Sequence, residues 1–192
     1  MKKQKAAIFG GSFDPPHIGH LQIIKSALEK LDIDKLIVVP AYLSPFKKGH
    51  SAPPELRLKW LKAVTADNPK VEVSDYEIKK GSKSYTIDTV RHFKHFFGTI
   101  YLIIGADNLK TLKKWHRYEE LDKMVKWVVA TRSDLYVPKR FIRLDVDIPI
   151  SSTELRENID PKWIPEPIRQ EVVRYYTKNR RAVEQRDRKK DR

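Results

Sequence analysis

Two histidines three residues apart, His17 and His20, are the side chains of this sequence best suited to phosphate chemistry. They follow a glycine pair, Gly10 and Gly11, which itself follows a short apolar run over residues 6–9. An imidazole can donate a hydrogen bond to a phosphate oxygen, and residues three apart share one face of a helix. If a helix begins here, both rings would lie beside its free N–H groups and the positive end of its dipole. This arrangement suits an anion, most naturally a polyphosphate, although a solvated surface pair would have the same spacing.

The segments around these histidines predict a buried strand, a glycine turn and a helix. Residues 6–9 form the strand, and glycines without a Cβ let the backbone turn sharply and approach a ligand closely. Asp14 is predicted to be the helix N-cap, with two prolines at the helix entrance. The inward face of the helix should contain Ile18, Leu21, Ile24, Ala27, Leu28 and Leu31, and the outward face Gln22, Lys25, Ser26, Glu29 and Lys30.

The remaining apolar runs alternate between strand and helix patterns. We predict strands at residues 35–40, 71–73, 100–104, 127–131 and 146–150, and helices at 54–66, from 84 onwards and at 165–176. Such alternation predicts a doubly wound, Rossmann-like α/β fold with a parallel sheet, helices on both faces and one cleft. We expect one domain over residues 1–179 and a charged, disordered tail over 180–192.

Three further patterns could bind ligands. A strand that runs into Gly105 and Asp107 is where α/β folds hold ribose hydroxyls, although Asp107 could be a plain N-cap. Ser151 and Glu154 fit a capping box, and Arg156 lies one turn further on, so this segment could form a second anion site. Two histidines at positions 92 and 95 have helical spacing but no third ligand near them in the sequence, so we predict no protein metal site.

Composition narrows the class of protein. The chain has 192 residues, no cysteine and a net charge of +14, of which residues 180–192 supply seven Lys/Arg against three Asp/Glu. No apolar run approaches the ~20 residues of a membrane span, and no signal peptide is evident, so we expect a cytoplasmic protein with no membrane partner. The remaining positive charge is scattered, with no arginine-rich helix, and a small anionic substrate explains a basic pocket as well as nucleic acid does, so we expect no nucleic-acid partner.

The string Gly-Gly-Ser-Phe-Asp-Pro-Pro-His-Ile-Gly-His, residues 10–20, resembles the (H/T)xGH signature of the nucleotidyltransferase superfamily. In this extended form it is similar to the bacterial nicotinate-nucleotide adenylyltransferases. Further matching elements follow in the family's order: Ser-Tyr-Thr-Ile-Asp-Thr at 84–89, Gly-Ala-Asp at 105–107, Trp-His-Arg at 115–117 and Ile-Ser-Ser-Thr-Glu-Leu-Arg at 150–156. Residues 44–47, Ser-Pro-Phe-Lys, depart from the family's Pro-Pro-His-Lys. The resemblance covers about residues 6–178.

This resemblance implies the transfer of AMP from ATP to nicotinate mononucleotide, giving deamido-NAD and pyrophosphate in NAD biosynthesis. It implies that His17 and His20 are the catalytic residues and donate hydrogen bonds to the phosphates. Mg²⁺ would be bound mainly through the triphosphate, with no all-protein cage. The implied ATP-binding residues are Gly10, Gly11, Ser12, Phe13, Gly105, Asp107, Ser151, Ser152, Thr153 and Arg156, and the implied acceptor-binding residues are Lys47 (or Lys48), Thr86, Trp115 and Arg132.

Alternatives remain open at this point. A sister adenylyltransferase acting on phosphopantetheine or on nicotinamide mononucleotide would use the same phosphate site, although the phosphopantetheine family usually has threonine at the position of His17. A nucleic-acid-binding protein that merely retains the fold would explain the charge and would bind with steep salt dependence. The sequence does not decide whether the protein forms a homo-oligomer.

Overall fold

The computed structural model describes residues 3–43, 49, 51–83, 85–131, 136–146 and 148–190, with side chains up to Arg180. Its centre is a six-stranded sheet in the order β3-β2-β1-β4-β5-β6. All neighbouring strands pair in parallel, which confirms the predicted doubly wound α/β fold. The strands are β1 (Lys5–Gly11), β2 (Lys35–Pro40), β3 (Val71–Val73), β4 (Thr99–Gly105), β5 (Lys126–Thr131) and β6 (Ile142–Asp145).

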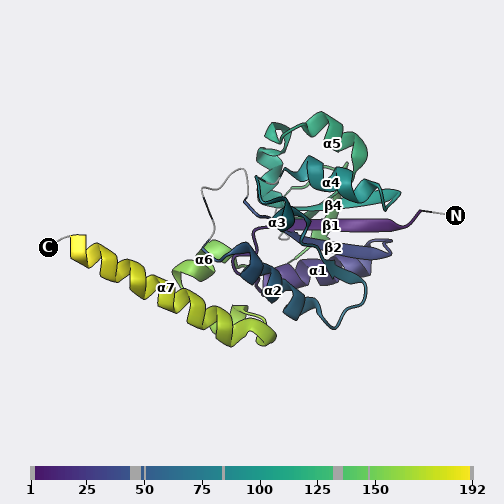
Figure 1. Ribbon diagram of the computed structural model, residues 1–192. Coiled ribbons are helices and arrows are strands. Elements are labelled where there is room, and N and C mark those ends of the chain that lie inside the picture. The colour runs from purple at the N-terminus through teal and green to yellow at the C-terminus, as the bar shows by residue number, and fades with distance from the viewer. Residues whose placement is uncertain are drawn as a thin grey trace.

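Helices cover both faces of this sheet (Figure 1). Along β1, Ala6 and Ile8 point into the core beneath the helix that carries Ile87, whereas Ala7 and Phe9 point toward the helix that carries Ile24. This alternation is what a strand buried on both sides requires. The helices are α1 (Ile18–Lys30), α2 (Pro54–Thr65), α3 (Tyr76–Lys80), α4 (Thr86–Lys94), α5 (Tyr118–Met124), α6 (Ser152–Glu157) and α7 (Arg169–Lys190).

The chain reverses its direction of winding at β1. Strands β2 and β3 are added on one side of β1, and β4, β5 and β6 on the other. In open α/β sheets, ligands bind outside the carboxyl ends of the strands at such a switch point. Here those ends are Gly11 of β1 and Gly105 of β4, so the topology directs attention to the same turn that the sequence singles out.

A third core cluster joins α7 to the outer side of α2. Trp60 of α2 packs with Ile168, Val172 and Tyr176, and Figure 1 shows α7 beside α2 and α6 with its C-terminal part extending beyond the rest of the molecule. Arg180, which the sequence assigns to the tail, donates hydrogen bonds to the carbonyls of Arg156 and Glu157 at the end of α6. The backbone of α7 is helical as far as Lys190, whereas the sequence predicts the last helix to end at residue 176; the disorder of the tail stays a prediction.

Two local predictions are wrong. The strand predicted at residues 146–150 lies instead at Ile142–Asp145. Its pairing with β5 ends with Asp145 opposite Thr131, the last residue of β5, whose carbonyl still accepts from the backbone N–H of Val146. Ser26 of α1, predicted to face solvent, is buried. Helix α1 contacts both β2 and β6, so the face it buries is wider than a single apolar stripe.

No helix in the described part of the chain is long and apolar enough to cross a membrane.

The short helix α3 is not predicted from the sequence, because a five-residue helix is too short to show periodicity.

Candidate functional site

The candidate site lies at the carboxyl ends of β1 and β4, where the glycine turn leads into α1. Gly10 is exposed, and a Cβ built there would meet only the carbonyl oxygen of Val39, at 3.9 Å. Gly11 has no such space, since its Cβ would lie 3.1 Å from the Phe13 ring. The turn therefore leaves room for a ligand at Gly10 and packs tightly against its own next residues at Gly11.

His17 and His20 are brought together at the start of α1. His17 is the N-cap, and its backbone N–H donates to Nδ1 of His20 at 3.1 Å. The two imidazole rings are stacked, with centroids 3.7 Å apart and planes 27° from parallel. Phe13 packs its ring edge against His20 with centroids 4.9 Å apart. The predicted pairing of the two histidines on a helix start is what the geometry shows.

Both histidines are held neutral, and one tautomer of His20 is favoured. Burial lowers the pKa of His17 to about 4, and burial together with the neighbouring His17 lowers the pKa of His20 well below its usual value. A neutral imidazole has one donor and one acceptor nitrogen. Since Nδ1 of His20 accepts from His17, its Nε2 carries the proton and is available as a donor.

The structure gives a packing reason for the residue types at Gly19 and Phe13. A Cβ on Gly19 would lie 3.0 Å from Nδ1 and 3.1 Å from Cε1 of His17, so glycine lets the His17 ring lie across the start of α1. Phe13 has a φ of 48°, in the left-handed region that bulky residues rarely adopt. Its burial and its edge contact with Phe9, at 5.3 Å between centroids, hold it there. Both positions follow from packing that the sequence pattern does not reveal.

Asp14 is not the N-cap that the sequence predicts. Its side chain is buried and its carboxylate accepts hydrogen bonds from the backbone N–H groups of Ser51 and Ala52, at 2.8 and 3.0 Å, and from the hydroxyl of Tyr176. An ionised carboxylate can accept several hydrogen bonds, and in this fold the donors come from distant segments of the chain and not from the start of α1. The cap position passes to His17.

Helix α6 brings the second predicted anion-binding segment to the same turn. Ser151 caps α6 and forms the predicted capping box with Glu154. Ser152 donates from Oγ to the carbonyl of Pro15 at 2.9 Å, and Arg156 donates from Nη1 to the carbonyl of Asp14 at 2.6 Å. The Arg156 guanidinium also donates to Oγ1 of Thr153, at 3.1 Å. The residues at 151–156 therefore lie against the histidine turn, as a shared phosphate site requires.

The acceptor candidates Thr86 and Trp115 lie over the other face of the sheet. Thr86 is the first residue of α4, and its neighbour Tyr85 packs on His116 with ring centroids 4.6 Å apart. Trp115 is half-buried against the same core cluster as Tyr85. Its Nε1 is buried and has no hydrogen-bond partner among the described residues. Thr86 and Trp115 thus belong to adjoining segments next to the end of β4.

Of the remaining predicted residues, the structure describes Asp107 but not Lys47, Lys48 or Arg132. Asp107 is exposed in a short 3-10 helix after β4, where its Oδ1 accepts from Asn108; the N-cap there is Gly105, so Asp107 is not a cap. Lys47, Lys48 and Arg132 lie outside the described residues, and their roles stay predictions. Among the described residues, no three His, Cys, Asp or Glu side chains are grouped to hold a metal ion, and His92 instead stacks on Tyr76.

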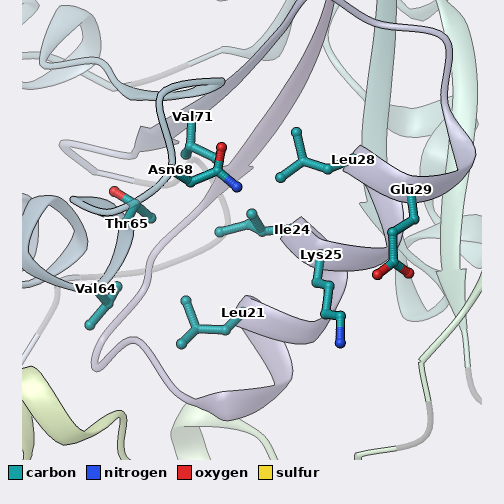
Figure 2. Close-up of a pocket in the computed structure, with 9 residues that line it drawn as sticks. All are labelled: Leu21, Ile24, Lys25, Leu28, Glu29, Val64, Thr65, Asn68 and Val71. Carbon is teal, nitrogen blue, oxygen red and sulfur yellow. The ribbon is translucent and has the colours of Figure 1, made fainter.

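A separate groove of about 410 Å³ lies between α1 and α2 (Figure 2). Leu21, Ile24 and Leu28 of α1 face Val64 and Val71 across it, with Lys25 and Glu29 at its edge. None of the predicted site residues lines it, so it is distinct from the histidine turn.

Sequence reasoning missed Arg57, Tyr176 and the roles of Asp14 and Gly19. Arg57 is fully buried and donates to the carbonyls of Ser12, Ala41 and Ala52. In the sequence Arg57 is one polar residue in an amphipathic helix, and no local signal marks it. Tyr176 shows only that it belongs to an apolar helix face.

Comparisons with known proteins find relatives over most of this chain. The cytidylyltransferase-like family matches residues 8–158, which include both the histidine turn and α6. A probable nicotinate-nucleotide adenylyltransferase of Nitratiruptor sp. is 48% identical over 90% of this chain and 98% of its own, and one of Aliarcobacter butzleri is 49% identical over 88% and 95%.

Solved structures show the same fold. The Plasmodium falciparum nicotinic acid mononucleotide adenylyltransferase complexed with NaAD is similar with a TM-score of 0.72, at 21% identity over 90% of this chain and 96% of its own. A putative nicotinate-nucleotide adenylyltransferase from Vibrio parahaemolyticus gives a TM-score of 0.67, at 23% identity over 90% and 99%.

Proposed function

The chain belongs to the cytidylyltransferase-like family and, within it, to the nicotinate-nucleotide adenylyltransferases, and from this we propose that it transfers the adenylyl group of ATP to nicotinate mononucleotide. The products are deamido-NAD and pyrophosphate. The observation that carries the proposal is the pair of stacked histidines at the start of α1, in which Nδ1 of His20 accepts a hydrogen bond and leaves Nε2 as the donor. Relatives 42–49% identical over most of the chain carry the name of this activity.

The reaction asks the protein to position two anions and to stabilise charge. The 5′-phosphate oxygen of nicotinate mononucleotide attacks the α-phosphorus of ATP in line, the bond from that phosphorus to the bridging oxygen breaks, and pyrophosphate leaves. No residue forms a covalent bond. A fixed donor stabilises the negative charge of the transition state without reorganising during the reaction. Nε2 of His20 is such a donor, and the N–H groups at the start of α1 add to it.

Arg156 is the candidate for the leaving pyrophosphate. Its guanidinium lies against the histidine turn through the Asp14 carbonyl, and its other described bond goes to Thr153. A guanidinium has five N–H donors, so further ones remain for phosphate oxygens. The Ser152 hydroxyl donates to the Pro15 carbonyl and so ties α6 to the turn, and its contact with ATP stays a prediction.

Mg²⁺ enters the proposal as a companion of ATP. The donor set fits an ion held by phosphate oxygens and water, since the one carboxylate of the turn, Asp14, accepts bonds from Ser51, Ala52 and Tyr176. When bound, the ion would neutralise part of the triphosphate charge.

The acceptor ring is proposed to bind beside Trp115, with Thr86 at the start of α4 near its carboxylate. A carboxylate accepts hydrogen bonds only, whereas the carboxamide of nicotinamide mononucleotide also donates them. A site lined by N–H groups and a hydroxyl would leave that NH₂ group facing donors. Losing one or two charge-assisted bonds at ~1.5–3 kcal/mol each corresponds to roughly 10- to 10⁴-fold in kcat/KM.

The test is a pyrophosphate-release assay with ATP and a panel of acceptors: nicotinate mononucleotide, nicotinamide mononucleotide and phosphopantetheine. We expect a strong preference for the acid. The Trp115→Ala variant should lose affinity for it while ATP binding is largely spared. Equal kcat/KM for the two mononucleotides would overturn the acceptor assignment and leave adenylyl transfer standing, whereas no release with any acceptor would overturn the transfer itself.

Cytoplasmic location and the absence of a nucleic-acid partner stay predictions, and whether the protein forms a homo-oligomer stays open. The absence of a nucleic-acid partner is tested by measuring duplex DNA and RNA binding as a function of salt. Steep salt-dependent binding without pyrophosphate release would favour the alternative function.

A further inference from the structure

In the segment between the glycine pair and His17, three backbone carbonyls accept hydrogen bonds from side chains of α2 and α6. The Ser12 carbonyl accepts from Nη1 of Arg57 in α2 at 2.5 Å, and the Asp14 carbonyl accepts from Nη1 of Arg156 in α6 at 2.6 Å. The Pro15 carbonyl accepts from Ser152. Arg57 is fully buried and would be costly to leave unpaired, and together these three bonds fix the path of the turn.

The Asp14 side chain adds a buried link to the last helix. Asp14 is 2% exposed and Tyr176 of α7 is 5% exposed. The Tyr176 hydroxyl donates to Oδ1 of Asp14 at 2.5 Å, and Asp14 also holds the N–H groups of Ser51 and Ala52. Burial, and then the Asp14 charge, raise the pKa of Tyr176, which keeps its hydroxyl protonated as a donor.

Tyr176 is itself held firmly. It belongs to the cluster in which Trp60 of α2 packs with Ile168 and Val172, and its ring lies 6.0 Å from the Trp60 ring. Asp14 lies three residues before His17 along the chain. A fixed hydroxyl on α7 therefore reaches the turn three residues before His17, whose backbone N–H sets the tautomer of His20.

We propose that Asp14 and Tyr176 are positioning residues for adenylyl transfer: the buried hydrogen bond from α7 to the turn fixes where His17 and His20 meet the α-phosphate. Neither residue touches the reacting atoms. The proposal rests on the proposed function, and it assigns a role in the reaction to a helix outside the strand-turn-helix unit. A displacement of the catalytic histidines by about 1 Å would lower the rate by up to about 10²-fold.

The experiment compares Tyr176→Phe with wild type in steady-state kinetics with ATP and nicotinate mononucleotide. The substitution removes one hydroxyl and keeps the ring in its cluster. We expect kcat to fall about tenfold while KM for ATP changes less than threefold and the melting temperature stays near that of wild type, because the lost interaction acts in the transition state.

Tyr175→Phe is the matched control. It lies next to Tyr176 on α7, and its exposed hydroxyl donates to the Ser51 carbonyl at 2.8 Å without touching Asp14. Its kcat should remain within twofold of wild type. A second variant, Asp14→Asn, keeps one acceptor oxygen and replaces the other with a donor; its kcat should fall further than that of Tyr176→Phe.

Wild-type kcat in Tyr176→Phe would overturn the proposal, and so would an equal loss in Tyr175→Phe. A lowered kcat that recovers fully when the assay is cooled below the variant's melting transition would show a structural role only, which also overturns it. Should the wild type use a different acceptor, the proposed function fails, and the same comparison made with that acceptor still decides the role of Tyr176.

Discussion

The backbone N–H of His17 donates a hydrogen bond to Nδ1 of His20, and the two rings stack 3.7 Å apart between centroids. This relationship joins the fold to the chemistry. The same bond that begins helix α1 also leaves Nε2 of His20 as its proton-bearing nitrogen. Phe13 packs against the His20 ring, so the orientation of that ring is set before a substrate binds.

The His20→Ala variant should lose about 10²–10³-fold in kcat, since this is the typical cost of removing one preorganised donor. His20→Asn is a sharper variant, because its amide oxygen can still accept from the His17 N–H while nothing remains at the position of Nε2. We expect both to be equally impaired, with circular dichroism spectra and melting temperatures close to wild type. Near-normal turnover in either would remove His20 from the mechanism.

The Gly19→Ala variant should impair the site through the His17 ring. The new Cβ would lie 3.0 Å from Nδ1, so the ring must move away from the helix start. We expect kcat to fall by about 10- to 10²-fold, the cost of a small misplacement at the reacting centre. The thermal melt should change little, since alanine favours the helix over glycine. An unchanged kcat would show that the position of His17 is not critical.

The stability of the free protein should fall as the pH is lowered from about 7 to about 4. Burial lowers the pKa of His17 to about 4, so below its unfolded pKa of 6.5 the unfolded chain binds a proton that the folded one does not. Through His17 alone, the free energy of unfolding therefore decreases by up to about 3 kcal/mol as the pH falls across this window. Urea titrations across this range measure the effect, and His17→Asn should be less pH-dependent. A wild-type curve that is equally steep in the variant would contradict the assignment.

Deleting residues 181–192 should leave kcat/KM within about twofold of wild type, because these residues are remote in sequence from every site motif and their charge is typical of a solvated segment. The deletion keeps Arg180, whose side chain donates to the end of α6. A large loss of activity or melting temperature in the truncated protein would show that the segment packs on the domain.

Much of the fold was predictable from local patterns. Strand runs such as residues 35–40 are apolar and β-branched, the glycine pair permits the turn, and the Ser151–Glu154 capping box needs residues only three apart. The stacking of His17 and His20 is equally local, because helical spacing alone puts them on one face. The sequence by itself therefore determined the strand-turn-helix unit and the two segments that are predicted to bind anions.

Only the tertiary structure decided what holds these segments together. Asp14 reads locally as a helix cap, yet its partners are Ser51, Ala52 and Tyr176, up to 162 residues away along the chain. Arg57 reads as a surface residue of an amphipathic helix and is fully buried. A buried charge must find hydrogen bonds wherever the fold places them, and local spacing cannot show which distant atoms those will be.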